Sequence, residues 1–190
     1  MNYIAGVDEV GRGCLAGNVF AAAVILPPDL THIGTLADSK KLSASKRTTL
    51  DAAIKQHAVA WSIAQANIDE IDRFNILQAS LMAMKRAIEK LNVQPDLVQV
   101  DGRDKPHTNL RAQCIIGGDR TIACISAASI IAKVARDKYM CELDKQHPGY
   151  DFSTNKGYGT KKHLQLINTI GISSVHRKSF KPISEIINYK

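Results

Sequence analysis

Acidic side chains lie at three places in the sequence where a short apolar run meets glycine. These residues are Asp8 with Glu9, Asp101 and Asp119. In α/β folds, functional groups gather where strands give way to loops. Carboxylates that converge there repel one another unless cations neutralise them, and ligation by oxygen favours Mg²⁺ or Mn²⁺ over zinc. Because Asp beside Gly is also ordinary turn chemistry, these residues predict a metal site only when they are taken together.

Hydrolysis of a phosphodiester is the reaction that such a site could catalyse. Two metals bound close together can activate a water molecule and stabilise the leaving oxygen during in-line attack. The formal net charge of +7 suits a polyanionic partner, because Lys and Arg that neutralise phosphates release condensed counterions. The acidic positions and the charge together favour a nuclease. A nucleic-acid-binding protein that has lost catalysis would carry the same charge and remains the alternative.

Hydrophobic periodicity predicts the elements that must position these residues. Short apolar runs bounded by Gly, Pro or acidic residues are typical of strands, and apolar residues at helical spacing are typical of amphipathic helices. We expect strands at residues 3–7, 19–26, 59–66, 97–100 and 114–116, and helices at 43–54, 76–91, 126–144 and 161–170. A parallel crossover into the strand at 97–100 indicates an α/β fold with a mixed sheet.

Length and composition narrow the class of protein further. With 190 residues, the chain is expected to form one domain, residues 1–190, in which a polar and basic segment from about 150 to 190 is a small appendage. The uncharged stretches at 13–28 and 121–132 are too short or too interrupted to cross a bilayer, and the amino terminus does not resemble a secretory signal. These features predict a cytoplasmic protein without a membrane span. The scattered cysteines predict free thiols.

Seven segments, in order along nearly the whole chain, resemble blocks of ribonuclease HII, the type 2 ribonuclease H family. They are Gly6-Val-Asp-Glu-Val-Gly-Arg-Gly13 with Leu15-Ala-Gly17, Asp38-Ser-Lys-Lys-Leu-Ser43, Val100-Asp-Gly102, Gly117-Gly-Asp119, Ser126-Ala-Ala-Ser-Ile-Ile-Ala-Lys133 with Arg136-Asp137, Gly157-Tyr-Gly-Thr160 with His163, and His176-Arg-Lys-Ser-Phe180. The resemblance implies an RNase H-like fold, in which a mixed five-stranded sheet has flanking helices and a small carboxy-terminal helical extension.

The same resemblance implies the activity and the partners. The chain would be an endoribonuclease that hydrolyses the RNA strand of RNA/DNA hybrids and cuts on the 5′ side of ribonucleotides embedded in duplex DNA. Cleavage would leave a 3′-hydroxyl and a 5′-phosphate. The family also implies a monomer. A related nuclease of the same fold that acts on DNA, such as a junction resolvase, could use the same carboxylate chemistry and is a second alternative.

By resemblance, the acidic residues acquire roles as metal ligands. Asp8, Glu9, Asp101 and Asp119 would hold two divalent metals, Mn²⁺ or Mg²⁺. Asp137 competes with Asp119 for the fourth place, because it also belongs to a family-like block. Its position well inside a predicted helix suits a supporting salt bridge better, so we expect Asp119 to be the ligand.

The resemblance also implies substrate contacts. Gly11, Arg12 and Gly13 would read the ribonucleotide 2′-OH, the group that separates RNA from DNA, largely through backbone atoms. Tyr158 would stack on the sugar of the next nucleotide. Contacts to backbone phosphate are expected from Ser39 and Lys40, and also from Lys161, Arg177 and Lys178, for which solvated surface charge is the alternative. His163 and His176 acquire no definite role, and neither is proposed as a ligand.

Two positions depart from the family pattern. The family commonly carries proline where this chain has Cys14 and Asn18. Proline would fix φ and stiffen the loop, so these substitutions question the rigidity of the loop and leave its chemistry unchanged.

Overall fold

The computed structural model describes residues 2–36 and 42–188, so the predicted phosphate contacts Ser39 and Lys40 lie outside the described residues. A five-stranded sheet has the order β3-β2-β1-β4-β5. The strands are β1 (Ile4–Val10), β2 (Val19–Ile25), β3 (Ala60–Ala66), β4 (Leu97–Asp101) and β5 (Ala112–Ile115), and the helices are α1 (Ala44–His57), α2 (Ile68–Glu89), α3 (Gly118–Thr121), α4 (Ala123–Gln146), α5 (Phe152–Asn155), α6 (Lys161–Ile170) and α7 (Ile183–Asn188). The predicted mixed sheet is confirmed.

Strand β1 is the point at which the strand order reverses. The chain forms β1, β2 and β3 as an antiparallel series on one side of β1. It then crosses back through α2, and β4 pairs with β1 in parallel, followed by β5 in parallel with β4. The carboxyl ends of β1, β4 and β5 therefore meet at one edge of the sheet, where α/β proteins place their ligand sites.

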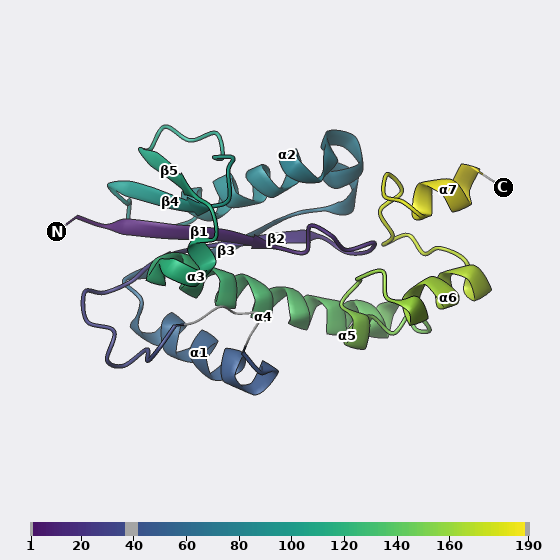
Figure 1. Ribbon diagram of the computed structural model, residues 1–190, viewed down its shortest axis with the longest axis horizontal. Helices are drawn as coiled ribbons and strands as arrows, with labels where there is room; N and C mark the ends of the chain where they lie inside the picture. Colours follow the sequence, from purple (N-terminus) through teal and green to yellow (C-terminus); the bar gives the residue numbers. More distant parts are fainter. Residues whose placement is uncertain (1, 37–41, 189–190) are drawn as a thin grey trace.

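Helices cover both faces of the sheet (Figure 1). On one face, α2 packs its buried residues against apolar side chains of the central strands, including Val7, Val98 and Val100. On the other, α4 and α1 enclose a second core. Gly6 shows how closely β1 approaches α4, because a Cβ at Gly6 would lie 2.1 Å from the carbonyl carbon of Cys124. Only glycine permits this approach, which brings the end of β1 against the first half of α4.

Helix α2 begins earlier than predicted and contains a kink. Asn67 and Glu70 form a capping box, which starts a first helical segment at Ile68 that the apolar periodicity did not indicate. Asn75 has φ of 67° inside the helix, and its side chain accepts a hydrogen bond from the backbone of Gln78 at 3.1 Å. The predicted helix from residue 76 is therefore the second segment, which begins after its own cap.

The carboxy-terminal part of the chain packs beyond the end of the sheet (Figure 1). A third core joins side chains of this part to α4 and to the loop after β1, and it includes Tyr150, Phe152, Ile167 and Ile183. Helix α6 has the predicted bounds and is capped by Thr160, whereas α5 and α7 were not predicted. No helix in the described residues is both long and apolar enough to cross a bilayer.

Candidate active site

Asp8 and Asp101 lie at the carboxyl ends of two adjacent parallel strands. The β1–β4 pairing runs through Val7 opposite Val100, so the two aspartates follow this pair at the same level. Side chains alternate between the faces of a strand, and Asp8 therefore shares with Gly6 the face that α4 covers. The predicted convergence of these carboxylates arises from the parallel crossover through α2.

Burial and mutual repulsion dominate the electrostatics of this site. The pKa of Asp8 is raised well above its ordinary value, first by burial and then by the negative charge of Glu9, with a further contribution from Asp101. Hydrogen bonds from the Ser129 hydroxyl and from the Glu9 backbone, the latter at 2.7 Å, oppose this rise. Burial also raises the pKa of Glu9, although Arg12 donates to its carboxylate at 3.1 Å. Carboxylates in this condition favour a bound cation.

Asp119 reaches the same edge of the sheet from α3. Gly117 precedes this helix with φ of 68°, and the backbone N–H of Asp119 donates to Asp101 at 3.3 Å. The Asp119 side chain is buried and lies 3.9 Å from the guanidinium of Arg120. The short helix thus connects the fourth predicted ligand to the third through a hydrogen bond.

A cavity of about 140 Å³ opens between the carboxylates of β1 and β4 and helix α4. It is lined by Asp8, Glu9, Val10, Asp101, Ser129, Lys133 and Tyr158. Among the described residues, no three acidic, His or Cys side chains are already arranged to hold a metal. Mg²⁺ usually binds through one or two carboxylates together with water and substrate phosphates, so a ready-made protein cage is not required. The all-oxygen donors and the raised pKa values fit a hard divalent cation.

Two buried guanidinium groups hold the loop that follows β1. Arg177 donates to the carbonyls of Gly11, Arg12 and Gly17 at 2.7 to 2.9 Å. Arg136 donates to carbonyls on both sides of the site, those of Ala16, Asn18 and Lys156. Both arginines are 0% exposed. The prediction that Arg177 contacts phosphate is therefore wrong, and so is the alternative of solvated charge, because backbone carbonyls take up its donors.

Gly11 and Gly13 are glycines for different reasons. Gly11 has φ of 95°, and a Cβ there would lie 2.1 Å from Nε of Arg136. Gly13 is exposed, and a Cβ there would meet no atom of the protein within 4 Å. The packing of the protein thus explains the glycine at position 11, whereas the glycine at position 13 faces open space.

Tyr158 is placed beside this loop by backbone pairing. It forms an isolated bridge with Cys14, and the N–H of Leu15 donates to the carbonyl of Gly157 at 2.7 Å. Tyr158 is 39% exposed, and Nζ of Lys133 lies 6.0 Å from the centroid of its ring. The structure therefore brings the predicted sugar-stacking residue to the same cavity as Asp8, Glu9 and Asp101.

Comparisons with known proteins agree with this arrangement. The family model described as Ribonuclease HII matches residues 5–183. A Ribonuclease HII of Coxiella burnetii (strain Dugway 5J108-111) is 52% identical over 183 residues, which cover 96% of this chain and 90% of the relative.

The chain belongs to the ribonuclease HII family. It is a metal-dependent endoribonuclease.

Solved structures confirm the RNase H-like fold expected of this ribonuclease HII. The crystal structure of ribonuclease H2 from Pyrococcus horikoshii OT3 has a TM-score of 0.80 at 21% identity and covers 98% of each chain. The crystal structure of Bst-RNase HIII in complex with Mn²⁺ has a TM-score of 0.74 at 17% identity and covers 99% of this chain and 70% of that one.

Two residues that line the cavity of this ribonuclease HII, Ser129 and Lys133, were not predicted. Ser129 and Lys133 lie on α4 one helical turn apart, and the hydroxyl of Ser129 bonds Asp8. Both belong to a block that resembles the family, so the signal was present, but only the packing of α4 on β1 directs them into the cavity. Asp137, the competitor for the fourth ligand, forms an ion pair with Lys133 at 2.7 Å.

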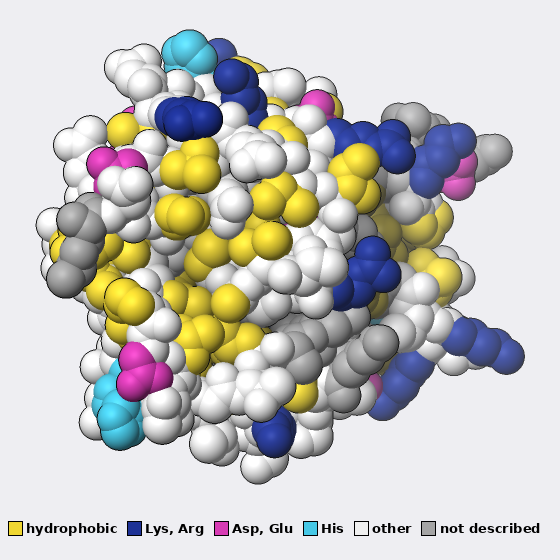
Figure 2. All heavy atoms as spheres, turned by 60° about the vertical axis from the view of Figure 1, so that its left-hand side comes forward, with side chains coloured by type: hydrophobic (Ala, Val, Ile, Leu, Met, Phe, Trp, Pro, Cys, Tyr) yellow, Lys and Arg dark blue, Asp and Glu magenta, His cyan; other side chains and the backbone are white. Residues whose placement is uncertain are grey.

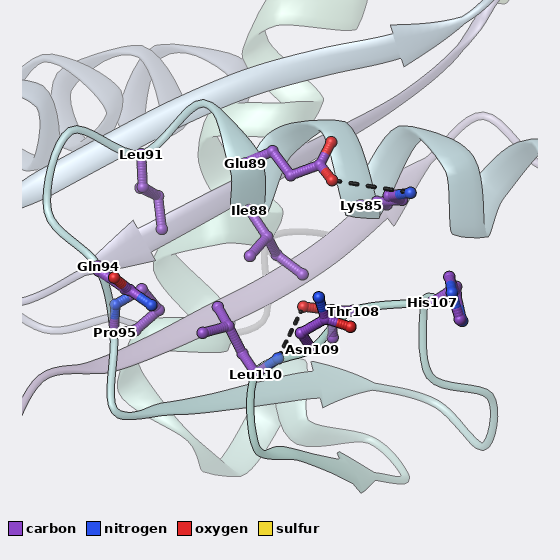
Figure 3. Close-up of a pocket in the computed structure, with 10 residues that line it drawn as sticks. All are labelled: Lys85, Ile88, Glu89, Leu91, Gln94, Pro95, His107, Thr108, Asn109 and Leu110. Carbon is purple, nitrogen blue, oxygen red and sulfur yellow. Dashed lines mark hydrogen bonds and ion pairs between the residues drawn. The ribbon is translucent and has the colours of Figure 1, made fainter.

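A larger cavity, of about 410 Å³, lies away from the carboxylates. Figure 3 shows it between the end of α2 and the segment at residues 107–110. Its polar groups are engaged with one another in part, since Lys85 pairs with Glu89 at 3.7 Å and Thr108 accepts from the backbone of Leu110. Asp8, Glu9 and Asp101, three of the four residues predicted to bind metal in this ribonuclease HII, line the smaller cavity and are absent from the larger one.

Proposed function

We propose that the carboxylate cavity hydrolyses the phosphodiester on the 5′ side of a ribonucleotide, in RNA/DNA hybrids and at ribonucleotides embedded in duplex DNA. The products are a 3′-hydroxyl and a 5′-phosphate. The observation that carries this proposal is that Asp8 and Asp101, at the ends of adjacent parallel strands, share one cavity with Tyr158 and adjoin the Gly11–Gly13 backbone.

The four carboxylates would bind the metals in two different roles. Asp8 and Asp101 would be the central ligands, because they lie at the same level near the carboxyl ends of two neighbouring strands, and Glu9 and Asp119 would complete the site. Mg²⁺ or Mn²⁺ bound there supplies charge neutralisation at the phosphate and an activated water molecule. The Mn²⁺ complex of the related Bst-RNase HIII supports a divalent metal of this kind. The Ser129 hydroxyl orients Asp8, since it donates to that carboxylate.

The loop after β1 selects ribose. Its backbone at Gly11, Arg12 and Gly13 lies next to Glu9, and Gly13 leaves open space in which a sugar can approach the main chain. Backbone groups at such a position can read the 2′-OH, which DNA lacks. Tyr158 lies across from this loop with an exposed ring that offers a stacking surface for the neighbouring nucleotide.

Basic side chains extend the surface that binds the duplex. Lys161 and Lys178 are exposed, as is Lys181 near the carboxyl terminus. Figure 2 shows Lys and Arg side chains concentrated at the right of the view, whereas hydrophobic side chains prevail on the face turned forward. Cations on this part of the molecule would neutralise phosphates of either strand. Ser39 and Lys40 are proposed to contribute as well.

The test uses a labelled DNA duplex that contains one internal ribonucleotide, with Mg²⁺ or Mn²⁺. An all-DNA duplex and an EDTA sample are the controls. We expect a single, metal-dependent cut on the 5′ side of the ribonucleotide, and no cut in the all-DNA duplex. The variants Asp8→Asn and Asp101→Asn should be inactive. Equal cutting of the all-DNA duplex would instead identify a DNA nuclease, and metal-independent binding without cutting would identify a binding protein.

A further inference from the structure

Two buried histidines connect the carboxy-terminal segment to the Tyr158 loop. His163 lies in the first turn of α6 and His176 in the segment after it, and they are 0% and 1% exposed. Their Nε2 atoms are 3.1 Å apart. Nδ1 of His163 lies 2.9 Å from the carbonyl oxygen of Tyr158, and Nδ1 of His176 lies 2.9 Å from the backbone nitrogen of Ser173. The four groups therefore form one continuous chain.

The direction of each hydrogen bond in this chain follows from its two ends. The Ser173 N–H can only donate, so Nδ1 of His176 accepts and the proton of this neutral ring is on Nε2. The Tyr158 carbonyl can only accept, so Nδ1 of His163 donates and its Nε2 is free to accept. His176 therefore donates to His163, and both rings are neutral. A second proton on either ring would place two donors face to face.

The surroundings of the rings suit neutral imidazoles. Burial lowers the pKa of His163, and burial together with the nearby His163 lowers the pKa of His176 to about 4. The rings of Tyr150 and Phe152 pack edge-on or tilted against the pair at 4.9 to 5.7 Å. The titratable groups that influence the pair are Asp151, before α5, and His147, after α4.

Arg177, the residue after His176, extends the connection to the loop that follows β1. His176 pairs with Ala16 through the backbone, and Arg177 donates to carbonyls of Gly11, Arg12 and Gly17. One dipeptide thus contacts both the ribose-reading loop and, through His163, the backbone of Tyr158. Neither histidine lines the carboxylate cavity.

We propose that His163 and His176 are positioning residues that fix the Tyr158 backbone relative to the Gly11–Gly17 loop, and thereby set where the Tyr158 ring meets the nucleotide next to the cleaved bond. This inference rests on the proposed role of Tyr158. His163 acts directly on the Tyr158 carbonyl, and His176 acts by holding the His163 ring.

Substitutions at His163 separate this role from simple packing. In His163→Asn, the side-chain nitrogen can take the place of Nδ1 and keep the bond to Tyr158, whereas His163→Leu fills the space without a donor. We expect His163→Leu to lower kcat/KM on the single-ribonucleotide duplex about tenfold, and His163→Asn to stay within about threefold of the parent. His57→Leu is the control, since His57 also stacks on a histidine, His32 at 5.3 Å, but in α1.

A double-mutant cycle with Tyr158→Ala decides whether His163 acts through Tyr158. If it does, His163→Leu causes no further loss of kcat/KM once the ring is absent. A loss that multiplies with that of Tyr158→Ala, or a His163→Leu variant with parental kinetics, would overturn the inference and leave the proposed function standing. If Tyr158→Ala itself cleaves like the parent, the proposed role of Tyr158 is wrong and the inference fails with it.

Two further measurements do not depend on His163→Leu folding. His176→Leu leaves the Tyr158 carbonyl bond in place, so it should show a smaller loss that is likewise absent in the Tyr158→Ala background. Two-bond ¹H–¹⁵N spectra of the parent at pH 7 should show His163 protonated on Nδ1 and His176 on Nε2. The same tautomer on both rings, or a charged ring at that pH, would refute the hydrogen-bond chain.

Discussion

Acid should weaken the folded protein through His176, and the size of the effect follows from the structure. The unfolded chain has an ordinary histidine pKa of 6.5, while burial lowers that of folded His176 to about 4. Because the folded pKa is the lower one, the unfolded state binds the extra proton first. The contribution to stability is therefore complete above pH 6.5 and is lost as the pH falls towards 4.

The two pKa values give the magnitude at any pH in this window. At pH 5, His176 alone should lower the free energy of unfolding by about 2 kcal/mol relative to pH 7.5. His163 adds to the loss, because its pKa is lowered as well. Carboxylates elsewhere also titrate, so the quantity to measure is the difference between the parent and His176→Asn, in which their effects largely cancel.

Urea unfolding of both proteins at pH 7.5 and pH 5 provides the assay. The free energy of unfolding of the parent, minus that of His176→Asn, should be lower by about 2 kcal/mol at pH 5 than at pH 7.5. A difference that stays constant within about 0.5 kcal/mol would refute the argument, because it would mean that His176 takes up its proton equally in the folded and unfolded states.

Three other predictions concern the cavity and its loop. Asp8→Asn should abolish cleavage but raise the free energy of unfolding at pH 7. Burial raises the pKa of Asp8, so its charged form destabilises the metal-free fold. Chemical denaturation that shows a lower free energy of unfolding would contradict this. Gly11→Ala should destabilise the protein by at least about 2 kcal/mol, because Gly11 has a positive φ and a Cβ there would clash with Arg136. Gly13→Ala should preserve stability and impair cleavage, because a Cβ there meets no protein atom. Thermal and kinetic assays that rank the two variants alike would refute the distinction. Arg177→Lys should lower the free energy of unfolding by about 3 kcal/mol, because one ammonium group cannot reach all the carbonyls that the guanidinium binds. A melting temperature like that of the parent would show that the loop does not depend on these hydrogen bonds.

The sequence was sufficient to predict the carboxylates because their signal is local. Asp8 and Asp101 each end an apolar run, and the helical pattern between the two strands implies the parallel crossover that makes them neighbours. The start of α6 was likewise predictable, since Thr160 is a conventional cap that accepts from the backbone of His163. The family resemblance placed Tyr158 in the site, which no local pattern would have done.

What the sequence left open depends on contacts between distant segments. The early start of α2 was missed because polar caps, not apolar periodicity, define it. Arg177 was expected at the surface because arginine usually is, and only the fold shows that carbonyls of a loop more than 150 residues earlier satisfy it. Ser129 was missed for the same reason, since its partner Asp8 comes from β1, and the contact between His163 and His176 likewise joins α6 to the segment after it.

The two missing prolines lose their importance once these contacts are considered. Proline would stiffen the loop by fixing φ within the chain. Here the restraint comes from outside, because the carbonyl of Asn18 accepts from Arg136, and its side-chain amide donates to Gln65 at 3.1 Å. Cys14 is fully buried, and its backbone forms an isolated antiparallel β-bridge with Tyr158. Proline at 14 or 18 would thus add little rigidity to a loop whose carbonyls are already bound by the guanidinium groups of Arg136 and Arg177.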